Sequence, residues 1–131
     1  MSYISTKIIE LGSCAFRQWR ATDTHCCKVH GYQLKVKFWF QGELDDRNWV
    51  VNFGGLKDLK KELQDQFDHT LCIAATDPLL SSFKELHQKG GCDLRVMDEV
   101  GIEKTAEYCF NVAKRHIESL TSGRCKVTKV E

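Results

Sequence analysis

One stretch of the chain alternates between apolar and polar side chains. From residue 32 to residue 40 every second side chain is apolar: Tyr32, Leu34, Val36, Phe38 and Phe40. A period of two predicts a β-strand with one apolar face and one largely wet face. An earlier β-rich stretch, Tyr3 to Leu11, is expected to continue past Gly12 towards Trp19 as a bent or bulged strand and to pair with it antiparallel.

Helices and shorter strands are predicted after this pair. Apolar residues at helical spacing predict a helix after Gly55 and a long helix from Ile102 to Leu120. Asp77-Pro78 has the form of a helix start. Further strands are expected at 49–53, 93–98 and 125–131. This order of elements is that of an α+β domain.

Length and charge exclude several classes of protein. The chain has 131 residues and suits a single domain, 1–131. Its 19 basic residues nearly balance 18 acidic ones, so no strong field favours nucleic acid or an anionic membrane. The apolar runs are too short for a membrane helix, and Met1 to Glu10 show no secretory signal. We therefore expect a cytoplasmic protein that does not bind nucleic acid or membrane.

The cysteines do not indicate a disulfide scaffold. Their number is odd, seven, and the amphipathic segments can form a core without cross-links. Reduced thiols are expected. Cys92, Cys109 and Cys125 are interpreted as small, half-buried apolar side chains.

The loop between the first two strands carries the densest group of reactive side chains. Residues 21–31 include His25, Cys26, Cys27 and His30 and show neither helical nor strand periodicity. Polar, sulfur-rich loops of this kind often carry functional sites.

Four motifs resemble those of one family, the 6-pyruvoyltetrahydropterin and 6-carboxytetrahydropterin synthases. The run from Cys26 to Tyr32 resembles the family's C-x-x-x-H-G-H motif. Residues 50–57 are similar to its V-x-D-F-x-x-L-K, with Asn52 in place of the acid. Phe67-Asp68-His69 is similar to its Leu-Asp-His, and Glu103, Ala106, Tyr108 and Phe110 echo its T-x-E-N-x-A-x-Y, with Ile102 where threonine is usual. The order and spacing of the motifs carry the resemblance.

The resemblance implies a fold and an assembly. The family has the tunnelling fold, an antiparallel sheet of about four strands with two main helices on one face. Its sheets assemble into a ring or barrel, so a homo-oligomer is expected. The family's final strand has no counterpart after residues 125–131. Glu131 is the candidate for the glutamate that anchors the family's pterin ring.

The resemblance also implies site residues. Cys26 occupies the position of the family's nucleophile or base, and Asp68 and His69 that of its proton relay. The family's zinc is held by three histidines, and only His30 matches one of them. Phe16 and Tyr32 occupy the other two positions, so we expect zinc to be absent or weakly bound.

Several alternatives for these residues remain open. A rearranged zinc site could recruit His25 or a thiolate from Cys14, Cys26 or Cys27, because zinc accepts nitrogen and sulfur. His30 could instead only hydrogen-bond its loop. Polar residues such as Asp68 and His69 can also cap a helix or pair on the surface.

Two functions follow from the resemblance. The first is a pterin-pathway lyase that acts on dihydroneopterin triphosphate or a related pterin, with a small-molecule partner only. The second is a noncatalytic or altered member that binds a pterin or purine without zinc. For the first, Cys26, Asp68 and His69 must converge near His30 in the assembled oligomer.

Overall fold

Two long strands form the centre of the sheet. The computed structural model describes residues 1–131, and in it β1 (Tyr3–Phe16) pairs antiparallel with β2 (His30–Gly42). The register shifts between Glu10 and Gly12, which places a β-bulge in β1. The predicted strand pair and its bulge are therefore confirmed.

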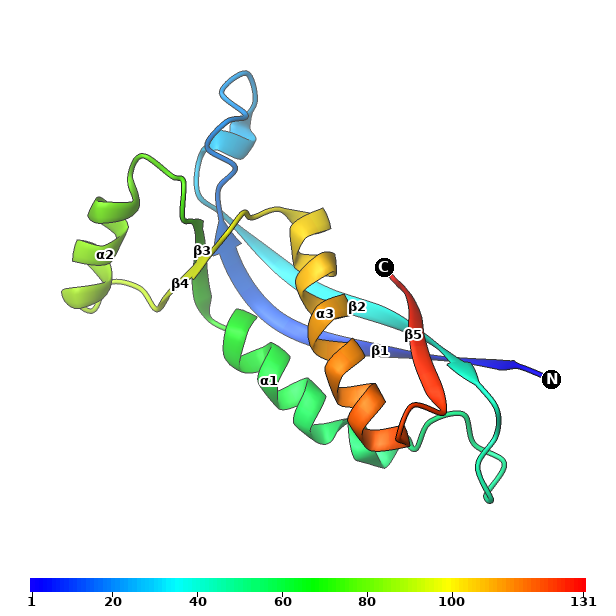
Figure 1. Cartoon of the computed structure of the whole chain (residues 1–131). Helices are drawn as coiled ribbons and strands as arrows, with labels where there is room; N and C mark the ends of the chain where they lie inside the picture. The colour runs from blue at the N-terminus through cyan, green and yellow to red at the C-terminus, as the bar shows by residue number, and fades with distance from the viewer.

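Three shorter strands complete a five-stranded sheet in the order β4-β3-β1-β2-β5 (Figure 1). β5 (Cys125–Val130) pairs antiparallel with β2, whereas β3 (Thr70–Ala74) and β4 (Leu94–Met97) run parallel to β1. β3 pairs with β1 over Cys14 to Phe16 only. The rest of that edge of β1 pairs with no strand of this chain.

Two helices, α1 (Lys57–Phe67) and α3 (Ile102–Thr121), cover one face of the sheet. They lie against β1, β2 and β5, while α2 (Leu80–Gln88) lies beside β3 and β4 (Figure 1). Alternate residues of β2 and the apolar stripe of α1 form the core, in which Phe38, Phe40, Leu59, Leu63 and Phe67 are almost completely buried. The α+β class is confirmed. No helix has the length and apolar character needed to cross a membrane.

The structure differs from the sequence-based expectations at two strands. Residues 49–53 form no strand, because the side chain of Asn52 accepts a hydrogen bond from the Gly54 N–H (2.9 Å) and starts a 3-10 turn, Phe53–Leu56. β3 was not predicted. All five of its residues are buried, so it shows no alternation. With β3 and β4 parallel to β1, the sheet is mixed instead of fully antiparallel.

Candidate functional site

The β1–β2 ladder brings together the three positions that the sequence analysis aligned with the family's zinc ligands. Phe16 lies opposite His30, and Cys14 lies opposite Tyr32. Because every second residue of a strand faces the same side, all four side chains share one face. The rings of Phe16 and Tyr32 stack with centroids 4.3 Å apart and planes 7° apart. An aromatic pair thus occupies two of the three positions aligned with zinc ligands.

His30 is the one histidine at the three aligned positions. It is exposed, and its Nδ1 lies 2.8 Å from the Lys28 carbonyl oxygen. Because that oxygen only accepts, Nδ1 carries the proton and donates, and Nε2 is free. Histidines that bind a metal through Nε2 usually adopt this tautomer. No group of three or more His, Cys, Asp or Glu side chains is placed to hold a metal ion. The residues present therefore do not fit a three-histidine zinc site.

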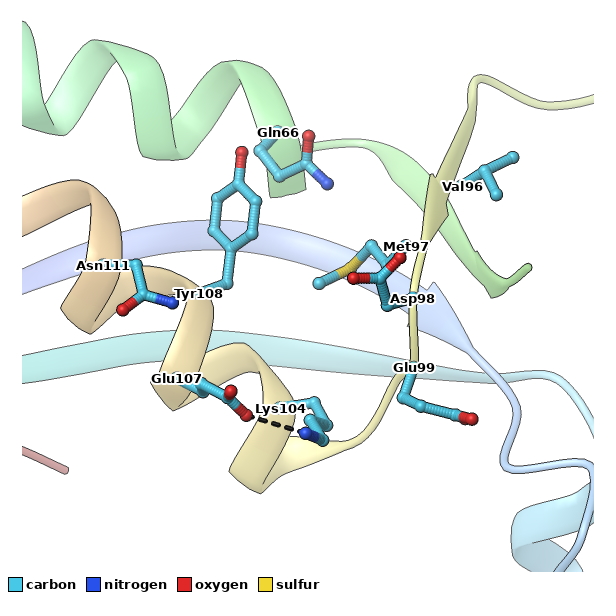
Figure 2. Close-up of a pocket in the computed structure, with 9 residues that line it drawn as sticks. All are labelled: Gln66, Val96, Met97, Asp98, Glu99, Lys104, Glu107, Tyr108 and Asn111. Carbon is cyan, nitrogen blue, oxygen red and sulfur yellow. Dashed lines mark hydrogen bonds and ion pairs between the residues drawn. The ribbon is translucent and has the colours of Figure 1, made fainter. Parts of the chain in front are cut away.

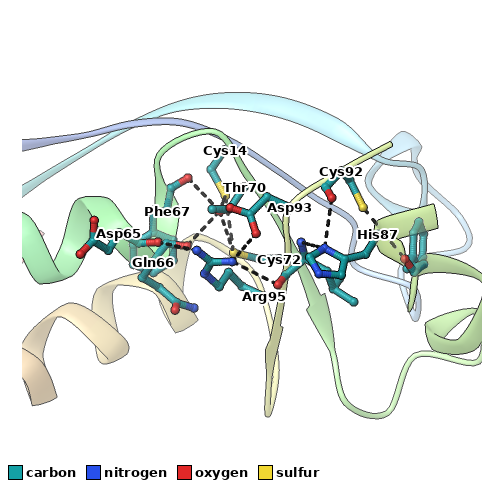
Figure 3. Close-up of polar contacts among 12 residues, drawn as sticks. Cys14, Asp65, Gln66, Phe67, Thr70, Cys72, His87, Cys92, Asp93 and Arg95 are labelled. Atoms are coloured by element: carbon teal, nitrogen blue, oxygen red, sulfur yellow. Dashed lines mark hydrogen bonds and ion pairs between the residues drawn. The ribbon is translucent and has the colours of Figure 1, made fainter. Parts of the chain in front are cut away.

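The cysteines considered for a rearranged site make separate contacts. The buried Cys14 Sγ lies 3.6 Å from Cys72 Sγ and 3.8 Å from Thr70 Oγ1 (Figure 3). The hydrogen bond with Cys72 lowers the pKa of Cys14, although burial opposes the shift. Cys27 donates instead to the Thr24 carbonyl (3.2 Å). In this arrangement Cys14 and Cys27 belong to different hydrogen-bond networks.

Asp68 and His69 form a hydrogen-bonded pair fastened to β1. Asp68 caps the C-terminus of α1, and His69 follows in the left-handed region with φ of 59°. The Asp68 Oδ1 lies 2.8 Å from His69 Nδ1 and accepts the Ser13 N–H at 3.1 Å. The His69 N–H donates to the Ser13 carbonyl at 2.6 Å. The predicted pair is brought together, and Asp68 is also the helix cap that the alternative anticipated.

The bulge in β1 makes room for this pair. Gly12 has φ of 101°, and a Cβ there would lie 2.0 Å from Asp68 Oδ1. A residue with a side chain would therefore be strained and would collide with the carboxylate. The sequence analysis noted Gly12 only as a bend. Its role could not be seen from sequence, because Asp68 is 56 positions away.

Cys26 lies in a different part of the chain. It belongs to a short 3-10 turn, His25–Cys27, in the loop between β1 and β2, and its side chain is exposed. Its N–H donates to Thr24 Oγ1 (3.0 Å), and its carbonyl accepts from the Gln18 N–H (2.8 Å). Neither contact involves Asp68 or His69. Convergence of the three across a subunit boundary stays a prediction.

Glu131 lies at the edge of a small cavity. Its backbone exchanges two hydrogen bonds with Lys37 of β2, 2.8 and 2.9 Å long. The cavity, about 180 Å³, lies between β2 and the start of α3, and its lining includes Leu11, Gln33, Ile102 and Glu131. Glu131, the candidate pterin anchor, thus lines the same cavity as Ile102. Ile102 is the residue that stands where the family usually has threonine.

A second, larger cavity contains none of the predicted site residues. It measures about 410 Å³ and lies where β4, the end of α1 and the first turns of α3 meet (Figure 2). Tyr108 stands in it with its ring edge-on to Phe67 (5.3 Å), and burial raises the Tyr108 pKa. Lys104 and Glu107, three residues apart on α3, form an ion pair of 2.8 Å in its lining. In the sequence these helix residues have the pattern of an ordinary solvated face.

The chain matches known proteins over most of its length. The family model for 6-pyruvoyl tetrahydropterin synthase matches residues 10–131. A protein of Archaeoglobus fulgidus is 34% identical over 88 residues, which are 63% of this chain and 76% of that protein. Its name, a provisional assignment, is 6-carboxy-5,6,7,8-tetrahydropterin synthase.

Solved structures share the fold at low sequence identity. An uncharacterized protein from Wolinella succinogenes superposes with a TM-score of 0.79 at 20% identity, covering 99% of this chain and 91% of that chain. A catalytic-residue mutant of Plasmodium vivax 6-pyruvoyltetrahydropterin synthase gives 0.65 at 17% identity, covering 98% and 91%. The Plasmodium falciparum synthase gives 0.65 at 15%, covering 97% and 88%. These likenesses confirm the fold expected from the motifs.

Proposed function

Because this chain belongs to the 6-pyruvoyl tetrahydropterin synthase family, we propose that it acts in the pterin pathway by binding a pterin-like small molecule without the family's zinc. The observation that supports binding without zinc is the stacking of the Phe16 and Tyr32 rings. Neither a phenyl ring nor the phenol of Tyr32 replaces an imidazole as a zinc ligand. With only His30 left, the site lacks the three protein ligands of a catalytic zinc.

The ligand would be held by its ring. The carboxylate of Glu131 can accept two hydrogen bonds from the guanidine-like edge of a pterin, and it borders the cavity between β2 and α3. Hydrogen bonds to a charged acceptor are stronger than those between neutral groups and would give the site its selectivity for such a ring.

A second candidate function is favoured by the Asp68–His69 pair. The carboxylate accepts the Nδ1–H of His69, which leaves Nε2 free to take a proton from a ligand. The charged Asp68 would then stabilise the imidazolium that forms. With Cys26 of a neighbouring subunit as a further base, the chain would catalyse proton transfer on the side chain of a pterin, a lyase-type step that uses no metal.

Metal content and ligand binding test the proposal together. The full-length protein, purified without chelator, should hold well under one zinc per chain and still bind 7,8-dihydroneopterin in calorimetry. Glu131→Gln should weaken that binding by about tenfold, the effect of one charged hydrogen-bond acceptor. Glu43→Gln, an exposed glutamate outside the cavity, is the matched control. One tightly held zinc per chain, or no pterin binding, would contradict the proposal.

Turnover separates the two candidates. If the second is correct, the protein should convert dihydroneopterin triphosphate with release of inorganic triphosphate, and Cys26→Ser should abolish that release. A protein that binds the pterin and releases nothing is a binding member only. Sedimentation belongs to the same experiment, since the second candidate requires an oligomer at the concentration assayed.

A further inference from the structure

We infer that Arg17 and Asp77 are positioning residues for Cys26: their buried ion pair holds the loop that presents the thiol. The inference rests on the proposed function only in taking Cys26 as part of the site. The sequence analysis noted Asp77 only as part of a helix start and did not consider Arg17. They lie 60 positions apart and meet only in the folded chain.

The loop is held through its backbone. Gln18 N–H donates to the Cys26 carbonyl (2.8 Å), and the Arg17 guanidinium donates through Nη1 to the Cys27 carbonyl (3.0 Å). Thr24 Oγ1 accepts the N–H of Cys26 at 3.0 Å. The two peptide groups that orient the Cys26 side chain are therefore fixed by neighbours, while the thiol stays exposed.

Arg17 is itself fixed by Asp77. Its Nε donates to Asp77 Oδ2 at 2.8 Å and its Nη2 to Oδ1 at 2.6 Å. The two groups thus form a bidentate ion pair. The side chain of Asp77 is completely buried and that of Arg17 is 15% exposed. The guanidinium holds the pKa of Asp77 below its usual value. One guanidinium thus connects the turn before α2 to the Cys26 loop.

Asp77 is anchored from its other side. Its Oδ1 also accepts the Leu79 N–H at 2.8 Å, which ties the carboxylate to the turn that starts α2. With these contacts no buried polar side-chain atom is left without a partner. The loop is therefore joined to the turn before α2 through an ion pair that makes hydrogen bonds at both ends.

A second tether on the same loop provides a control. Arg20 pairs with Glu99 at 2.9 Å, and Trp19 donates to Thr76 at 3.2 Å. The Arg20 and Glu99 side chains are 57% and 36% exposed. Exposed ion pairs are screened and contribute little. Glu99→Gln should leave the loop in place, although it removes an ion pair from the same segment.

Arg17→Lys separates positioning from simple stability. A lysine keeps a positive charge near Asp77, but its single ammonium cannot pair with both carboxylate oxygens and also donate to the Cys27 carbonyl. Hydrogen exchange followed by mass spectrometry should show faster exchange in the segment 24–28, by about tenfold, as expected when a local unit opens more often. Exchange in α3 should not change.

Thiol chemistry gives a second readout. In the wild type, iodoacetamide should modify the exposed Cys26 faster than Cys27, whose thiol donates a hydrogen bond to the Thr24 carbonyl. Arg17→Lys should bring the two rates within about twofold of each other, because a loosened loop exposes both thiols. Peptide mass spectrometry assigns each site.

A paired variant keeps the test decisive if Arg17→Lys does not fold. Arg17→Met with Asp77→Leu removes both buried charges together and leaves neither unpaired. The same loosening is expected, because the donor to Cys27 is gone. Wild-type exchange and wild-type thiol selectivity in either variant would overturn the inference, as would an equal effect of Glu99→Gln. If the wild type does not bind a pterin, that result contradicts the proposed function and not this inference.

Discussion

The loop corner, residues 16–32, and the Asp68–His69 corner match the family's motifs in opposite ways. At the loop corner a stacked aromatic pair occupies two of the three positions that the sequence analysis aligned with zinc ligands, with Phe16 only 3% exposed. At the other corner the two side chains that match the motif, Asp68 and His69, are 39% and 84% exposed and are held through backbone contacts to β1. One corner is thus filled by packed aromatic rings, whereas the other leaves its polar groups open to solvent.

The largest loss of stability is expected at Gly12, which leaves room for Asp68 in the Asp68–His69 corner. Gly12→Ala combines a strained φ with overpacking against Asp68, each costing about 2 kcal/mol, so the free energy of unfolding should fall by about 4 kcal/mol. Urea denaturation measures this. Gly31→Ala, in the loop corner, meets no atom within 4 Å and should change stability by less than about 1 kcal/mol. Equal losses in the two variants would remove the difference between the corners.

The buried ion pair of the loop corner should give a pH-dependent effect. Asp77→Asn should lower the free energy of unfolding by about 3 kcal/mol at pH 7, because it leaves the charge of Arg17 unpaired. The pKa of Asp77 is lower in the folded chain than in the unfolded one. Its contribution is therefore complete above the unfolded value of about 3.9 and is lost as the pH falls through the folded value.

Urea titrations of wild type and Asp77→Asn, from pH 7 to pH 3, check the sign. The difference in unfolding free energy should be constant down to about pH 5 and should shrink below about pH 4. A difference that grows as the solution becomes acidic would mean that the carboxylate is not stabilised by Arg17.

Introducing histidines at positions 16 and 32 tests whether the loop corner differs from a three-histidine zinc site only in its side chains. Phe16→His with Tyr32→His places imidazoles beside His30 on one face of the β1–β2 ladder. Without metal the double variant should lose about 2 kcal/mol of unfolding free energy, since the stack of buried Phe16 on partly buried Tyr32 is removed. It should also gain about one zinc per chain, measured by elemental analysis. Phe16→Leu with Tyr32→Phe is the control. A folded double-histidine variant without zinc would count against the alignment of these positions.

The smallest effect is expected at His69. Its left-handed backbone conformation disfavours a residue with a side chain, and its imidazole is mostly exposed. His69→Gly should therefore change the free energy of unfolding by less than about 1 kcal/mol, in either direction. Thermal denaturation measures it. A loss of several kcal/mol would show that the imidazole serves the fold, and the Asp68–His69 corner would then be structural.

The elements that could be predicted are those with a strong local pattern. The alternation from Tyr32 to Phe40 located β2, and helical spacing located α1 and α3. β3 escaped because a strand buried on both faces has no alternation. Residues 49–53 were wrongly expected to form a strand, since the capping side chain of Asn52 outweighs a short apolar run.

The site was predictable only where local motifs mark it. A motif made Asp68 and His69 candidates, and the structure shows a contact of 2.8 Å between their side chains, while their role stays a prediction. Gly12 and the Arg17–Asp77 pair were not, because each acts on a partner more than 50 positions away. Contacts of that kind depend on how β1 and β3 are placed side by side, which no local pattern records.

The partial pairing of β1 with β3 has a consequence for symmetry. Because β1 pairs with β3 only from Cys14 to Phe16, the first part of β1 offers unpaired backbone groups on one side of the sheet, and β5 offers them on the opposite side. Two different edges that join copies head to tail make a heterologous interface, which grows without limit unless rotation closes it into a ring. In such a ring the angle between the two edges, fixed within a single chain, determines the number of subunits.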